Sequence, residues 1–136
     1  MSYADLTAIG TIADVMPLYD ENRIIVYMGL HLLSSTSNIG VRALLRAIGI
    51  EDSKKVTSSM IGYTLAPRIN AAGRIGDAAR AVQLFLTNSP RNAAVIAEEL
   101  CITNKERQQT ENIIFEEALK QIEALVYVRR AVRSSE

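Results

Sequence analysis

Residues 89–126 read SPRNAAVIAEELCITNKERQQTENIIFEEALKQIEALV, and neither proline nor glycine interrupts them after Pro90. Ser89 followed by Pro90 predicts a helix start, because serine caps a helix and proline fits its first position. Apolar side chains gather near both ends of the stretch, whereas residues 103–112 are polar almost all round. A helix that is polar around its circumference usually bridges two packed bodies. We therefore expect one long connecting helix over residues 89–126.

The residues before this stretch have the same helical character. Ala, Leu and Ile recur there with helical spacing, tryptophan is absent, and Pro67 is expected to end a helix. The chain of 136 residues is long enough for one hydrophobic core and too short for two. The predicted fold class is all-α. Helices are expected over residues 5–16, 21–33, 41–48, 55–65 and 78–86, with a loop over residues 68–77 and a disordered basic tail over residues 127–136.

The composition excludes little about the partners of the protein. Fifteen Lys and Arg residues balance fifteen Asp and Glu residues, so the net charge of zero neither requires nor excludes a nucleic acid. The single cysteine, Cys101, cannot form an internal disulfide, which favours a reducing compartment. The sequence opens without a signal-peptide pattern and contains no apolar run of membrane-spanning length. We expect a cytoplasmic protein that does not interact with membranes.

Asp14 is the one acidic side chain in the apolar run Ile9-Gly10-Thr11-Ile12-Ala13-Asp14-Val15-Met16-Pro17-Leu18. A carboxylate in a buried run needs a partner, because desolvating an isolated charge is costly. Two interpretations stay open from the residues alone: Asp14 pairs with a helix end or an arginine, or it binds a metal ion. No histidine or acid lies three or four positions from Asp14, so the helix cannot build a metal site by itself.

The stretch LAPRINAAGRIGD, residues 65–77, combines two arginines, an amide and two glycines. Arginine recognises phosphate with two parallel hydrogen bonds, and glycine lets a backbone approach a ligand closely. One interpretation is that Arg68, Asn70 and Arg74 clamp a phosphodiester. The alternative is that Asn70 caps a helix and both arginines pair with acids at the surface.

Three segments, Gly10–Leu18, Leu65–Arg74 and Asn104–Gln108, together resemble the RecJ family of the DHH phosphoesterase superfamily. The first segment is similar to sequences across the whole superfamily. The second segment, with its Ala-Pro-Arg, asparagine and closing Gly-Arg in this order, resembles RecJ in particular. The resemblance covers roughly residues 4–122.

The resemblance implies a fold and an activity. Residues 1–88 are expected to be the C-terminal helical part of a DHH-type α/β domain, and residues 89–126 the helix that connects it to a second domain. The activity implied is metal-dependent 5′-to-3′ degradation of single-stranded DNA in repair and recombination. Asp14 is then a catalytic residue that binds Mn²⁺ or Mg²⁺, and Arg68, Asn70 and Arg74 hold a DNA phosphate.

The sequence also departs from the family pattern. It contains no Asp-His-His motif and only one histidine, His31, which matches no family ligand. Family members supply most metal ligands upstream of the segment that resembles this chain, and they continue downstream into a second domain. We therefore expect an internal segment of a nuclease that is inactive in isolation and binds no metal tightly.

Two further hypotheses stay open beside the nuclease segment. The chain is alternatively a non-catalytic helical module that binds DNA or another protein. The apolar side chains of Ile114, Phe115 and Leu119 also favour a homo-oligomer, because exposed apolar helix faces of this size tend to find partners.

Overall fold

The computed structural model describes residues 3–51, 55–75 and 77–133, and within these ranges every regular element is a helix. The all-α fold class is therefore confirmed. None of the described helices is both long and apolar enough to cross a membrane. The helices are α1 (Ala4–Ala13), α2 (Asp20–Leu33), α3 (Ile39–Ala47), α4 (Ser58–Met60), the π-helix η1 (Ile61–Leu65), α5 (Ala66–Ile75), α6 (Ala78–Leu86) and α7 (Pro90–Arg133).

The chain divides into two units, Met1–Asn104 and Lys105–Glu136. The first unit includes the start of α7, whose side chains Ala93, Ile96 and Leu100 are buried in the core. The first turns of the helix predicted to connect two domains thus pack against the preceding helices. The second unit is helical as far as Arg133, and its described side chains are almost all exposed.

The tail over residues 127–136, which the sequence predicted to be disordered, is helical over most of its length. Helix α7 continues through residues 127–133. The residues there, Tyr, Val, Arg, Arg, Ala, Val and Arg, include no glycine or proline that would end a helix. Residues 134–136 lie outside the described part of the chain.

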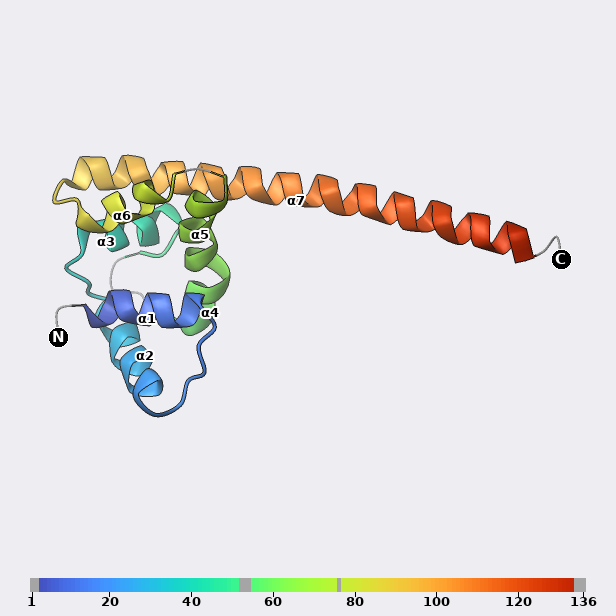
Figure 1. Ribbon diagram of the computed structural model, residues 1–136. Coiled ribbons are helices and arrows are strands. Elements are labelled where there is room, and N and C mark those ends of the chain that lie inside the picture. Colours follow the sequence, from blue (N-terminus) through green and yellow to red (C-terminus); the bar gives the residue numbers. More distant parts are fainter. Residues whose placement is uncertain (1–2, 52–54, 76, 134–136) are drawn as a thin grey trace. The chain divides into compact units, whose positions relative to one another are not determined.

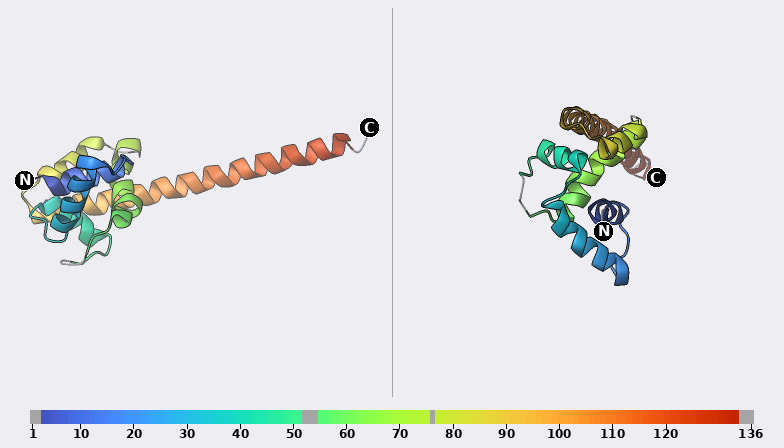
Figure 2. Two further views of the ribbon diagram at one scale, coloured as in Figure 1. Left: turned by 90° about the horizontal axis from the view of Figure 1, so that it is seen from below. Right: turned by 90° about the vertical axis from the view of Figure 1, so that its left-hand side faces the viewer.

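Helices α1 and α2 form a tightly packed pair within the first unit (Figures 1 and 2). Gly29 of α2 permits this approach. A Cβ atom at Gly29 would lie 2.3 Å from the Cβ of Ala8 and 2.4 Å from the carbonyl oxygen of Ala4. The two helix backbones therefore approach more closely than any residue with a side chain at position 29 allows.

A second group of helices, α3, α6 and the beginning of α7, lies above this pair in the view of Figure 1. Leu44 of α3 and Leu84 of α6 are both fully buried where their helices meet. Arg80 of α6 donates two hydrogen bonds to one carboxylate oxygen of Glu99 in α7, at 2.8 Å from Nε and 2.5 Å from Nη2. The ion pair joins the outer edges of α6 and α7.

A buried polar network links the α1–α2 pair to α3 and α6. The hydroxyl group of Thr36 donates to the carboxylate of Asp5 at 2.6 Å, and Arg42 donates to the carbonyl oxygen of Thr36 at 3.0 Å. Asn38 accepts from the backbone N–H of Val41 and donates through its amide to the carbonyl oxygen of Phe85 at 3.0 Å. Because buried polar groups are costly unless they are paired, these bonds fix the end of α6 against the start of α3.

Pro67 does not end a helix, and the predicted loop over residues 68–77 was wrong. Residues 61–65 form a π-helix, and the backbone N–H of Ala66 donates to the carbonyl oxygen of Ile61, five residues back. This wider turn lets Pro67 enter the first turn of α5, where its missing N–H leaves no helical bond broken. The sequence from Ala66 to Ile75 is therefore helical. Of the predicted loop, only Asp77 is described outside a helix, and it caps the start of α6.

Candidate functional site

Asp14 lies directly after the last residue of α1 and is exposed. The helix closes with two backbone bonds, from Val15 N–H to the Ile12 carbonyl oxygen and from Met16 N–H to the Thr11 carbonyl oxygen, both 3.1 Å long. This pair of bonds is the Schellman ending, which turns the chain away from the helix. The expectation that Asp14 sits within a buried helix was wrong, because α1 ends before it.

Val15 occupies the left-handed position of this helix ending, with φ of 53°. The end of α3 has the same pattern: the backbone N–H of Ile50 donates to the Leu45 carbonyl oxygen, and Gly49 has φ of 80°. Glycine adopts this conformation freely, whereas a β-branched residue is strained there. The helix that presents Asp14 thus ends in a strained residue where the comparable helix uses glycine. Strain of this kind clusters at functional sites.

Replacing Val15 with glycine is expected to stabilise the protein. The left-handed conformation destabilises a residue with a side chain by about 1–2 kcal/mol. Glycine removes this strain, but it loses more backbone entropy on folding, which offsets about 0.5–1 kcal/mol of the gain. Val15 is 84% exposed, so little apolar burial is lost. The free energy of unfolding in urea should therefore rise by about 0.5–1 kcal/mol. The reciprocal change, Gly49→Val, should lower it by about 1–3 kcal/mol, and equal effects of the two changes would contradict the strain argument.

The end of α1 attracts cations. The unpaired carbonyl groups at a helix C-terminus carry partial negative charge, and the last turn of α1 contains no basic residue to offset it. The Asp14 carboxylate adds a full negative charge at the same place. A carboxylate oxygen is also a ligand type that Mn²⁺ and Mg²⁺ accept. The chemistry of Asp14 therefore fits such an ion, as one ligand.

The described part of the chain does not complete a metal site around Asp14. Among these residues, no three His, Cys, Asp or Glu side chains gather closely enough to hold a metal ion. His31 is exposed on α2, where its Nδ1 lies 2.9 Å from the Tyr27 carbonyl oxygen. A metal ion at Asp14 would thus need ligands from residues outside this set.

Asp14 and Asn70 line the same pocket, although 55 other residues separate them in the sequence. The pocket has a volume of about 420 Å³ and lies among α1, α5 and α6. Its remaining lining comes from Leu6, Ile9, Gly10, Ala13, Ile69 and Phe85. Sequence reasoning missed these residues, because their meeting depends on how three helices pack. A glycine in the middle of α1 was the only local signal.

Arg68 and Arg74 lie on different sides of α5. In a helix with 3.6 residues per turn, Asn70 and Arg74 are four positions apart and share a face, whereas Arg68 is rotated away from both. The three side chains therefore do not form one clamp, and that detail of the sequence interpretation was wrong. It assumed a loop, in which neighbouring side chains can converge on one ligand.

The two arginines also differ in their surroundings. The guanidinium group of Arg68 is half-buried and donates through Nη1 to the Thr64 carbonyl oxygen, while its buried Nε has no hydrogen-bond partner. Because this Nε is buried, a phosphate from outside can meet only the partly exposed remainder of the Arg68 side chain. Arg74 is exposed one turn beyond Asn70. Asn70 and Arg74 therefore form the accessible edge beside the Asp14 pocket.

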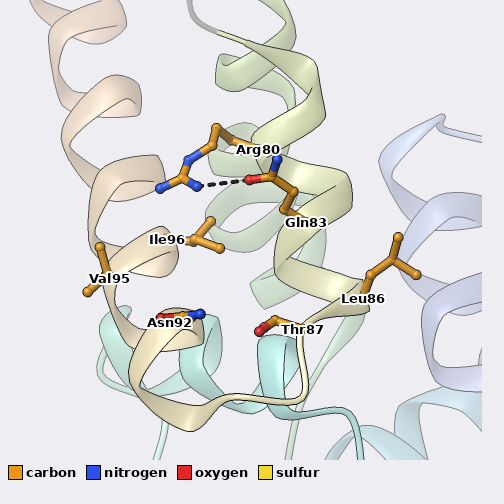
Figure 3. A pocket seen from close by; sticks show the side chains of 7 residues that line it. All are labelled: Arg80, Gln83, Leu86, Thr87, Asn92, Val95 and Ile96. Atoms are coloured by element: carbon orange, nitrogen blue, oxygen red, sulfur yellow. Dashed lines mark hydrogen bonds between the residues drawn. The ribbon is translucent and has the colours of Figure 1, made fainter.

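A second hollow, of about 500 Å³, lies between α6 and the start of α7 (Figure 3). Its arginine, Arg80, is already engaged, since it pairs with Glu99 and donates to the side-chain oxygen of Gln83 at 2.8 Å. An arginine whose charge is neutralised in this way is a poor phosphate ligand. This hollow therefore does not compete with the Asp14 pocket as a DNA site.

Comparison with known proteins gives consistent relatives, although no family model matches the chain. The chain is 41% identical over 119 residues to the single-stranded-DNA-specific exonuclease RecJ of Bacillus subtilis. The aligned region covers 88% of this chain and 15% of that protein. The chain is also 40% identical over 121 residues to the enzyme of the same name from Thermus thermophilus. This alignment covers 89% of this chain and 18% of that protein. The chain thus spans less than a fifth of the length of these two relatives.

Solved structures agree. The crystal structure of Thermus thermophilus RecJ in complex with Mn²⁺ matches with a TM-score of 0.76 at 40% identity, covering 83% of this chain and 17% of that one. A structure of exonuclease RecJ bound to manganese matches with a TM-score of 0.80 at 39% identity, and the match covers 88% of this chain and 30% of that one. Sequence and structure therefore identify the same relatives over most of the chain. The chain belongs to the RecJ family and corresponds to a segment of its much longer members.

Proposed function

We propose that this chain is part of a metal-dependent single-stranded DNA exonuclease that degrades DNA from 5′ to 3′. The observation that carries the proposal is the pocket shared by Asp14 and Asn70, which joins the two segments that resemble the family. Residues 1–88 then belong to the helical part of a DHH-type domain and residues 89–126 to the connecting helix. The proposed compartment is the reducing cytoplasm, which the free Cys101 fits.

In this proposal, Asp14 holds one Mn²⁺ or Mg²⁺ ion of the complete enzyme. Such an ion supplies activation of water and neutralisation of charge on the phosphodiester. Asp14 presents its carboxylate from a rigid helix end, so the position of the ligand does not depend on a mobile loop. Exposure of the carboxylate leaves room for ligands from the rest of the enzyme.

The residues of α5 contact the DNA backbone in this proposal. Arg74 extends from the same face as Asn70 and meets a phosphate beside the pocket. Arg68, which is partly exposed on the other side of α5, contacts a second phosphate. Each arginine that neutralises a phosphate of single-stranded DNA contributes a slope of about −0.7 to the dependence of log K on log salt.

Arginine substitutions on α5 are expected to flatten this salt dependence. Binding of a fluorescein-labelled single-stranded oligonucleotide is measured by anisotropy at several salt concentrations. Arg74→Ala should reduce the steepness of the slope by about 0.7, and Arg68→Ala combined with Arg74→Ala by about 1.4. Arg80→Ala is the matched control, because it removes the same charge from a residue that is paired with Glu99. If Arg80→Ala reduces the slope by the same amount, the DNA binds diffusely to the positive charges of the chain and not at the proposed site on α5.

Self-association through the second unit stays a prediction. Its apolar side chains Ile113, Ile114, Phe115, Leu119, Ile122 and Leu125 are between 40% and 70% exposed. Sedimentation of the chain at increasing concentration measures whether this face forms a homo-oligomer.

A further inference from the structure

We propose that the pocket among α1, α5 and α6 receives a nucleobase of the bound DNA strand. The inference rests on the proposed function and adds a site to it, since the nuclease activity itself requires only contacts to the metal and the phosphates. It is based on the open space at Gly10, on the chemistry of the pocket lining and on the position of Asn70 in the lining.

Gly10 leaves open space in the pocket that the packing of the protein does not require. It lies in the interior of α1, where glycine destabilises a helix by about 1 kcal/mol relative to alanine. A Cβ atom at Gly10 would meet nothing within 4 Å, whereas one at Gly29 on the neighbouring helix would collide with Ala8. Close helix packing therefore explains Gly29 and does not explain Gly10. Since Gly10 lines the pocket, its missing side chain enlarges the space available to a ligand.

The lining of the pocket favours a flat apolar ligand over a phosphate. Leu6, Ile9, Ala13, Ile69 and Phe85 contribute apolar surface, and the volume of about 420 Å³ is within the range of small-molecule sites. No lysine or arginine is among the lining residues. Phe85 offers an aromatic ring, and stacking of a base on such a ring contributes about 1–3 kcal/mol.

Asn70 gives the pocket a polar group that suits the edge of a base. An amide side chain both donates and accepts hydrogen bonds, so it can pair with the donors and acceptors that each of the four bases presents. Asn70 is exposed, and Arg74 lies one turn further along the same face of α5. A nucleotide can therefore place its base against Asn70 and its phosphate toward Arg74. The proposed pocket accepts any base, because an amide can pair with the edge of each of the four.

The test uses a ligand without phosphate. The ¹⁵N-labelled chain is titrated with 2′-deoxyadenosine, and separately with inorganic phosphate, while backbone amide shifts are recorded by NMR. Deoxyadenosine should shift the amides of Gly10, Asn70 and Phe85 in a saturable way, and phosphate should leave them in place. Shifts of these amides with phosphate, or none with deoxyadenosine, would overturn the proposal.

A leucine at position 10 tests the pocket directly. Gly10→Leu fills the open space at a position where a Cβ meets nothing, so the melting temperature should be kept or raised. Binding of deoxyadenosine should weaken about tenfold or more. Gly73→Leu is the matched control, because Gly73 is also a helical glycine with nothing within 4 Å and does not line the pocket. Unchanged binding in Gly10→Leu would overturn the proposal.

The outcomes for the base pocket and for the proposed function are separable. A salt dependence of DNA binding that is less steep in Arg74→Ala, together with no response to deoxyadenosine, would reject the base pocket and keep the phosphate site. Deoxyadenosine binding that depends on Gly10, together with DNA binding that does not depend on Arg74, would reject the phosphate site.

Discussion

A 5′-phosphorylated single-stranded oligonucleotide incubated with the purified chain and Mn²⁺ is expected to keep its full length. Hydrolysis by a two-metal site needs several carboxylate and histidine ligands. The sequence contains one histidine and no Asp-His-His motif, and the described residues gather no three potential ligands. Asp14 alone cannot hold two ions. The expected loss of rate relative to a complete enzyme is on the order of 10⁶ or more.

Two controls make this result informative. Thermus thermophilus RecJ, assayed in the same buffer, shows that the substrate and the metal are suitable. Asp14→Ala separates an activity of the chain from a contaminating nuclease, because only the former depends on this carboxylate. Shortening of the DNA by the unmodified chain, without shortening by Asp14→Ala, would refute the expected inactivity. It would also mean that one carboxylate recruits further ligands that the described residues do not bring together.

The helical fold could be predicted where local signals decide the structure. Ser89 caps α7 as expected, with its hydroxyl oxygen accepting from the backbone N–H of Asn92 at 3.3 Å. Gly49 ends α3 in the left-handed conformation that its position predicts. The expectation failed at Pro67, because the effect of a proline depends on the preceding turn. The π-helix before it has no signature in local sequence, so the chain continues into α5 where a loop was expected.

Only two residues of the candidate pocket were singled out from the sequence, and their arrangement was not predictable. Asp14 and Asn70 follow from the resemblance, and the pocket that they share requires the packing of α1 against α5. The clamp of three α5 residues was an error of the same origin, since a helix separates side chains that a loop can bring together. The burial expected for Asp14 was wrong because a Schellman ending with valine in the glycine position is not recognisable from sequence.

Substitution of Gly40 by alanine is expected to remove a large part of the stability of the first unit. A Cβ atom at this position of α3 would lie 1.8 Å from the carbonyl oxygen of Leu84 and 3.1 Å from its Cγ. The first contact is with backbone, so no change of rotamer relieves it, and α3 and α6 must separate. Leu44 and Leu84 are fully buried at this crossing, so separation exposes core surface. The expected loss is about 3–5 kcal/mol, out of a total of about 5–15 kcal/mol for a domain.

Thermal unfolding followed by circular dichroism measures this loss, with Gly73→Ala as the matched control. Gly73 lies in the interior of α5 with nothing within 4 Å of its Cβ position, so alanine there should raise the free energy of unfolding by about 0.5–1 kcal/mol. The sign of the effect thus depends on the space around each glycine. The Gly40 contact also adjoins the bond from Asn38 to the Phe85 carbonyl oxygen, so separating α3 from α6 moves a wall of the Asp14 pocket. An unchanged melting temperature in Gly40→Ala would therefore contradict both the α3–α6 crossing and the pocket that it supports.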